Sequence, residues 1–251
     1  MNIGDYVVRK KYNKDILFEI IDIVDNIYYL RGVELRLVAD SKKDDLLLSD
    51  IQLEEDMSFE FVNEPMLKGK VLHLDGDKDY LKMCKEKYKD LGIRCECYYI
   101  QECEMKDKVV YLLELHKPHI LVITGHDALR KDKDPKVLDN YLHSYDYMST
   151  IKNARSYQSN KDELVIIAGA CQSYYEMLLA SGANFASSPK RMNIHALDPV
   201  FVASQVASES VRNYCDIENI ILKTSHKDDG MGGIDTKGVA RKIYPMKGRS
   251  I

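Results

Sequence analysis

The sequence predicts an α/β protein made of two domains, with a boundary at residue 65. Short strands separated by turns fill residues 1–65, as in a small β-barrel. From residue 66 onward, apolar runs alternate with helical segments. Those runs contain few polar positions, which is typical of strands that are buried on both faces of a parallel sheet. We therefore expect residues 66–251 to form a mostly parallel sheet flanked by helices.

The amino-acid composition of the chain argues against several classes of function. The chain has 251 residues, of which 45% are apolar and 30% are charged, as in ordinary globular proteins. A net charge of −4 argues against a protein that coats nucleic acid. No apolar run approaches the ~20 residues of a membrane span, and the N-terminus carries no secretory signal. We expect a cytoplasmic protein with neither a nucleic acid nor a membrane as its partner.

The N-terminal domain is expected to be an SH3-like β-barrel. Its predicted strands cover residues 6–9, 16–24, 27–31 and 33–38, and Asp25-Asn26 forms a turn between the second and the third. Eight basic residues stand against fifteen acidic ones in this domain, a net charge of −7. An acidic barrel is suited to contact a protein, either a substrate or a partner.

The second domain alternates strands with helices. Strands are predicted at residues 71–75, 94–100, 119–124, 164–168 and 220–222, and residues 183–188 are a candidate for one more. Helices are predicted at residues 78–91, 106–116, 173–180 and 199–214. Residues 127–162 exceed an ordinary connection, so we interpret them as an inserted loop and helix.

Candidate catalytic residues follow two of these strands. Functional sites in open α/β sheets form at the carboxyl ends of the strands. His126 follows the strand at 119–124, and Cys171 follows the strand at 164–168. A helix that begins just after Cys171 favours the nucleophilic thiolate, and His126 can protonate a leaving amine. The backbone N–H groups of Cys171 and Asp127 are candidate oxyanion donors.

Other interpretations of these residues remain open. A strand-end cysteine is often simply buried, and a loop histidine is often a surface residue. The six cysteines show neither a disulfide framework nor zinc-ligand spacing, because Cys95 and Cys97 are separated by one residue. The Asp75-Gly76-Asp77 stretch imitates the Asp-x-Asp motif of magnesium-dependent phosphatases, with mismatched surroundings. A non-catalytic scaffold protein is the remaining alternative.

The two candidate segments resemble the caspase-like cysteine peptidases. In that group one apolar block ends in His-Gly and a later block ends in Ala-Cys. Residues 165–171, VIIAGAC, match the second block, whereas glycine precedes His126 and Asp127 follows it. The resemblance implies a caspase-like fold for residues 66–251 and a Cys171–His126 dyad that needs neither a metal nor another cofactor.

Over nearly the whole chain the sequence resembles the YabG family of sporulation-specific peptidases. The matching stretches are GDYVVRK (4–10), LRGVELRL (30–37), ITGHD (123–127), AGACQS (168–173) and NIHALDP (193–199). The resemblance implies cleavage after arginine of spore coat or germination proteins, by an enzyme that is made in the mother-cell cytoplasm and can become associated with the spore coat. An arginine pocket needs a carboxylate, for which Asp127 and Asp198 are the candidates. The alternative for Asp198, which precedes Pro199, is an ordinary helix cap.

Overall fold

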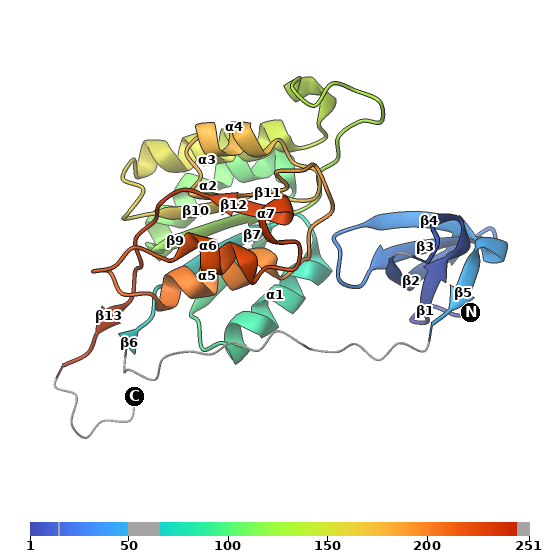
Figure 1. Cartoon of the computed structure of the whole chain (residues 1–251), viewed down its shortest axis with the longest axis horizontal. Helices are drawn as coiled ribbons and strands as arrows, with labels where there is room; N and C mark the ends of the chain where they lie inside the picture. Colours follow the sequence, from blue (N-terminus) through green and yellow to red (C-terminus); the bar gives the residue numbers. More distant parts are fainter. Residues whose placement is uncertain (15, 50–65, 245–251) are drawn as a thin grey trace. The chain divides into compact units, whose positions relative to one another are not determined.

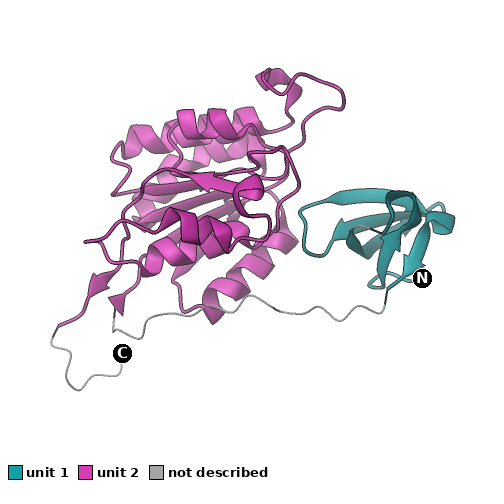
Figure 2. Ribbon diagram, in the orientation of Figure 1, with its two compact units in different colours: residues 1–60 teal, residues 61–251 magenta. Residues whose placement is uncertain are grey.

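The computed structural model describes residues 1–14, 16–49 and 66–244. The chain divides into two compact units, residues 1–60 and residues 61–251 (Figure 2). The predicted boundary at residue 65 lies outside the described residues. Among the described residues, no helix combines the length and the apolar character that are needed to cross a membrane.

The first unit is a five-stranded antiparallel sheet in the order β4-β3-β2-β1-β5 (Figure 1). Its strands are β1 (Tyr6–Arg9), β2 (Leu17–Val24), β3 (Ile27–Gly32), β4 (Val38–Lys42) and β5 (Leu46–Leu48). Asp25 and Asn26 both have positive φ, 50° and 63°, which lets two residues connect β2 to β3. The inward side chains form a small core: Val7, Phe18, Ile20, Tyr28, Leu30 and Leu46.

The predicted strand at residues 33–38 is wrong. The Gly32 N–H donates to the Leu37 carbonyl over 2.6 Å, which closes a turn, and β4 begins only at Val38. The alternating pattern belongs to this turn instead, where Arg36 is buried. The strand β5 follows the 3₁₀ turn Lys43–Asp45. A 3₁₀ turn also connects β1 to β2 (Lys10–Tyr12).

The second unit contains the predicted mostly parallel sheet. Its strands are β7 (Val71–Asp75), β8 (Cys95–Tyr99), β9 (Ile120–Thr124), β10 (Val165–Ala168), β11 (Phe185–Ser187) and β12 (Met231–Gly233). They lie in the order β12-β11-β10-β9-β7-β8, and β12 alone among them runs antiparallel to its neighbour. A separate antiparallel pair joins β6 (Met66–Leu67) to β13 (Arg241–Lys242). Because β8 and β9 flank β7, the connections diverge between β7 and β9, and open α/β sheets bind their ligands at the carboxyl ends of strands at such a point.

Helices cover both faces of this sheet (Figure 1). They are α1 (Lys78–Asp90), α2 (Glu102–His116), α3 (Ser144–Tyr157), α4 (Tyr175–Ala180), α5 (Asp198–Ser208), α6 (Ile217–Leu222) and α7 (Lys227–Gly230), with a 3₁₀ turn at Leu138–Asn140. The contacts place α2, α3 and α4 on one face and α1 and α5 on the other. Residues 220–222, predicted as a strand, are the end of α6 instead.

The core beneath α2 and α3 holds the strand ends in place. Alternate residues of the central strands face these helices and are fully buried: Leu72, Leu74, Leu121, Ile123, Ile166 and Ala168. Burial of each large side chain stabilises the fold by roughly 1.5–3 kcal/mol. The loops that follow β7, β9 and β10 are therefore anchored on a rigid support.

Candidate active site

Three side chains that can take part in catalysis follow equivalent positions at the carboxyl ends of neighbouring strands. Three strand residues lie next to one another in the parallel register: Leu74, Ile123 and Ala168. Asp77, His126 and Cys171 each follow their strand's residue by three positions. The register therefore places His126 and Cys171 after equivalent positions of the neighbouring strands β9 and β10, and Asp77 after the equivalent position of β7.

The side chains of Asp77 and His126 are hydrogen-bonded to each other. The Nε2 atom of His126 lies 2.9 Å from Oδ2 of Asp77. The other oxygen of Asp77 accepts the N–H groups of Asp79 and Tyr80, at 2.8 and 3.0 Å, and so caps the start of α1. The cap fixes the carboxylate, and the carboxylate orients the imidazole. None of the described residues hydrogen-bonds Nδ1 of His126, so this nitrogen remains available for proton transfer.

The backbone of His126 is held from both sides. Its N–H donates to Oε1 of Glu102 over 2.8 Å, and its carbonyl accepts the hydroxyl of Tyr147 over 2.9 Å. A Cβ atom at Gly125 would lie 2.4 Å from Oε1 of Glu102, and one at Gly76 would lie 2.1 Å from the same oxygen. Both glycines thus make room for the Glu102 carboxylate, which explains the glycine that precedes His126.

Cys171 is buried and is held by backbone groups. Its side chain is 3% exposed, and the N–H of Ile194 lies 3.4 Å from Sγ. The helix that was expected directly after Cys171 begins only at Tyr175 and is six residues long. The N–H of Ile194 rather than a helix end therefore faces the sulfur, which also lies 4.0 Å from the Ile194 carbonyl oxygen. A hydrogen bond of 2.9 Å from the N–H of Gln172 to the carbonyl of Met192 joins the loop that contains Cys171 to the loop that contains Ile194.

Asp127 connects the loop of His126 to the loop of Cys171. One of its oxygens accepts the N–H groups of Ala128 and His143, and the other accepts the hydroxyls of Ser144 and Ser173. Burial raises the pKa of Asp127, and these four hydrogen bonds act in the opposite direction. Its carboxylate braces the site, and its predicted role in an arginine pocket stays a prediction. Its backbone N–H finds no acceptor among the described residues.

Asp198 is fully buried and is only partly satisfied. It is the first residue of α5, and Oδ1 accepts both the N–H and the hydroxyl of Ser225, each at 3.0 Å. Its Oδ2 atom has no hydrogen-bond partner among the described residues. Burial raises the pKa of Asp198, against the hydrogen bonds from Ser225 and the attraction of His195 and His226. The carboxylate therefore does not act as the ordinary helix cap that the sequence left open.

Potential metal ligands also lie beside the site. His73, Asp75 and Cys84 present ligand atoms within 4.8 Å of one another, and all three side chains are buried. Thr124 links two of them, at 2.7 Å from Nε2 of His73 and at 2.8 Å from Oδ2 of Asp75. These contacts are those of a buried hydrogen-bond network under α1. The N–H of Asp77 donates to Asp75 over 2.9 Å, so the network also supports the partner of His126.

Sequence reasoning missed three residues that position His126: Asp77, Glu102 and Tyr147. Asp77 was considered only within the Asp-x-Asp alternative, yet its carboxylate pairs with a histidine. Its position after a strand and directly before a helix was a usable signal for a cap. Glu102 and Tyr147 lie on α2 and α3, and no local pattern connects them to a histidine on β9's loop.

Comparison with known proteins agrees with the resemblance in the sequence. The family described as YabG peptidase U57 matches residues 2–66 and 54–245. The "Sporulation-specific protease YabG" of Bacillus subtilis (strain 168) is 38% identical over 284 aligned residues, which cover 98% of each chain. No solved structure matches the chain. The chain therefore belongs to the YabG peptidase family.

Proposed function

We propose that this chain is a cysteine endopeptidase in which Cys171 is the nucleophile and His126 is the general acid and base. The Cys171 thiol passes its proton to His126, the resulting thiolate attacks the scissile carbonyl carbon, and the carbonyl electron pair moves to oxygen. Collapse of this intermediate expels the amine, which takes a proton from His126 and leaves a thioester on Cys171. Water, deprotonated by His126, then hydrolyses the thioester and restores the thiol.

The observation that carries this proposal is the hydrogen bond between Asp77 and His126. Both residues follow strand positions that are equivalent to the one that Cys171 follows. Asp77 accepts from Nε2, which leaves Nδ1 to exchange the proton. The carboxylate also stabilises the imidazolium that forms when the histidine is charged. Histidine, cysteine and an orienting acid therefore come from three adjacent strand ends, the arrangement that nucleophilic catalysis requires.

Two backbone N–H groups support the reacting atoms. The N–H of Ile194 points to the Cys171 sulfur over 3.4 Å and favours its anionic form. The N–H of Asp127 has no acceptor among the described residues, which supports its assignment, with that of Cys171, as an oxyanion donor. Neither role needs a metal ion or an organic cofactor.

The proposed substrates are spore coat or germination proteins, cut after arginine in the mother-cell cytoplasm. The name of the Bacillus subtilis relative supports a role in sporulation. Asp198 is the preferred partner for the arginine, because its unpartnered Oδ2 is a buried acceptor that a guanidinium would satisfy. Since the side chain is fully buried, arginine binding requires that the surroundings of Ser225 open. Asp127 is the second candidate.

The decisive experiment is cleavage of matched peptides with arginine, lysine or glutamine before the scissile bond, with EDTA present. Wild type is expected to cut the arginine peptide, and Cys171→Ala and His126→Ala should each lose at least about 10³-fold in kcat/KM. Cys103→Ala, which removes an exposed thiol, is the matched control. Activity that survives in Cys171→Ala contradicts the mechanism, and equal cleavage of all three peptides contradicts the arginine preference.

A scaffold protein remains the alternative, and thiol chemistry separates it from an enzyme. An activated Cys171 should react with iodoacetamide faster than Cys84 and Cys215, which are also buried. Burial raises the pKa of Cys215 to about 12, so this thiol is a suitable slow reference. Equal and slow modification of all three cysteines, together with no cleavage, would support the scaffold.

A further inference from the structure

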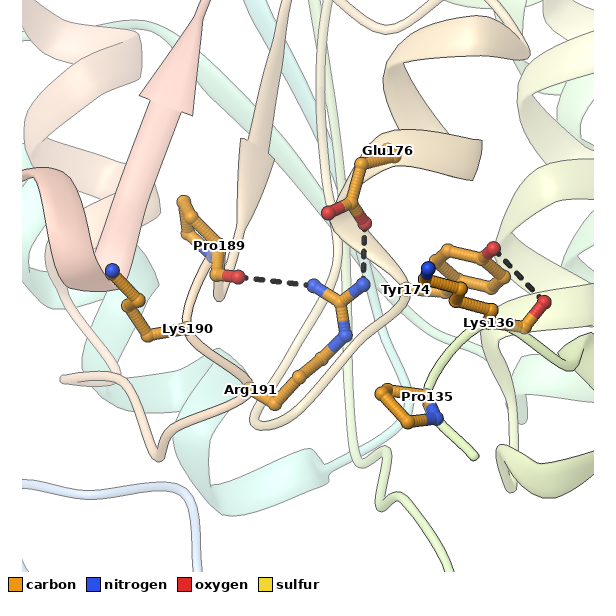
Figure 3. Close-up of a pocket in the computed structure, with 7 residues that line it drawn as sticks. All are labelled: Pro135, Lys136, Tyr174, Glu176, Pro189, Lys190 and Arg191. Atoms are coloured by element: carbon orange, nitrogen blue, oxygen red, sulfur yellow. Dashed lines mark hydrogen bonds and ion pairs between the residues drawn. The ribbon is translucent and has the colours of Figure 1, made fainter. Parts of the chain in front are cut away.

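A pocket of about 500 Å³ lies beside the Cys171 loop (Figure 3). Its lining comes from the insertion after β9, the start of α4 and the loop after β11: Pro135, Lys136, Tyr174, Glu176, Pro189, Lys190 and Arg191. Tyr174 follows Cys171 by three residues, which limits the separation of their Cα atoms to about 10 Å. An extended peptide rises about 3.3 Å per residue, so this pocket can hold a side chain two to four residues from the bond that is cut.

Arg191 forms the rigid floor of the pocket. Its guanidinium pairs with Glu176 and donates to the carbonyl of Pro189 over 3.1 Å, and its Nε donates to the hydroxyl of Tyr141 over 2.6 Å (Figure 3). The guanidinium also lies 5.2 Å from the ring centre of Tyr174. Arg191 itself adopts a left-handed φ of 54°. Its charge is thus balanced by Glu176, and its position is fixed.

Lys136 and Lys190 give the pocket a net positive charge. Lys136 and Lys190 are both exposed, and neither forms an ion pair with a described residue. In Figure 3, Arg191 lies between them, and the Tyr174 hydroxyl donates to the Lys136 carbonyl. The pocket therefore combines two uncompensated ammonium groups with the apolar faces of two prolines and one tyrosine. A glutamate or aspartate side chain fits this chemistry, because the positive charge of the two lysines attracts its carboxylate and its methylene groups can contact the apolar walls.

We propose that this pocket is a substrate subsite for an acidic side chain two to four residues from the scissile bond, with Lys136 and Lys190 as its specificity-determining residues. The inference rests on the proposed function, since it assumes a peptide that is bound across Cys171. The subsite lies outside the arginine pocket and has the opposite charge. Substrates would then be selected by an arginine and a nearby acidic residue together.

The test uses arginine peptides that carry glutamate or glutamine at each position two to four residues to either side of the scissile bond. Binding to Cys171→Ala, measured by fluorescence anisotropy, should favour glutamate about tenfold at one of these positions, and the preference should shrink as salt is added. The double variant Lys136→Glu/Lys190→Glu should reverse the preference, and Lys136→Gln/Lys190→Gln should abolish it. The control is Lys223→Glu, on the exposed residue that follows α6.

Each outcome separates this inference from the proposed function. Equal binding of all glutamate and glutamine peptides overturns the subsite, as does a glutamate preference that persists in both double variants. Peptide cleavage by wild type without any preference also overturns the subsite but leaves the peptidase intact. A lysine-dependent glutamate preference in Cys171→Ala, combined with no cleavage by wild type, supports the acidic site and contradicts the peptidase mechanism.

Discussion

The loop of His126 and the loop of Cys171 are held in different ways. Side chains from the beginnings of α1 and α2 and from α3 fix His126: Asp77, Glu102 and Tyr147. Cys171, in contrast, is contacted by a backbone N–H of Ile194. His126 itself is therefore fixed by individual side chains, whereas the sulfur of Cys171 meets the backbone of a neighbouring loop, and Asp127 braces the Cys171 loop through Ser173.

This difference teaches where single substitutions should matter. A side chain that orients the base can be removed without changing the fold of its helix, so its loss appears mainly in activity. A backbone contact survives most side-chain substitutions. We expect the largest mutational effects outside the dyad on the histidine side.

Asp77→Asn should have the largest effect. Asparagine retains an oxygen that caps α1, so the free energy of unfolding should change by less than about 1 kcal/mol. Its neutral amide cannot stabilise the imidazolium and permits the wrong tautomer, so kcat/KM should fall by roughly 10²-fold or more. Peptide kinetics and urea unfolding of the same preparation measure both. Activity within about threefold of wild type would show that Asp77 only caps the helix.

Glu102→Ala should have an intermediate effect. The substitution leaves the N–H of His126 without its acceptor, which costs about 1–3 kcal/mol of stability, and it frees the histidine to shift. A shift of about 1 Å is sufficient to lower kcat/KM by roughly 10²-fold. Glu104→Ala is the matched control, because Glu104 lies on the same helix in an exposed pair with Lys108. Similar losses of activity in both variants would contradict the positioning role of Glu102.

The central strands were predicted to within a residue or two, because strands buried on both faces have continuous apolar runs. β7, β9 and β10 are such runs, and each is followed by glycine or a polar residue. The same rule failed at residues 220–222, where three apolar residues are too short to separate strand from helix. The cap was present in the sequence, since Asp216 accepts the N–H of Asn219 and starts α6.

The sequence predicted the candidate reacting groups of the site but not the side chains that position them. His126 and Cys171 follow apolar runs, so their place at the carboxyl edge could be inferred from the sequence. That Asp77 faces His126 depends on the register of β7 against β9, which is set by packing between segments almost fifty residues apart. Local patterns carry no information on such a pairing.

The smallest effect is expected for substitution of Asp198, whose carboxylate differs from those beside His126. The carboxylates beside His126 have hydrogen-bond partners, whereas Oδ2 of Asp198 has none in the part of the chain that the structure describes. Because burial raises the pKa of Asp198, the folded protein holds its proton more tightly than the unfolded chain does. Its contribution to stability is therefore greatest below the ordinary value of 3.8 and declines as pH rises through the raised pKa.

Asp198→Asn should consequently gain stability relative to wild type as pH increases from about 4 to 7, which urea unfolding at the two pH values measures. Asp107→Asn, on the exposed face of α2, controls for the loss of one negative charge. The KM for the arginine peptide is a second measurement. If Asp198 binds the arginine of the substrate, this KM should be higher in Asp198→Asn than in wild type. An unchanged KM together with the expected pH effect would limit Asp198 to its structural contact with Ser225 and leave Asp127 to be tested for the pocket.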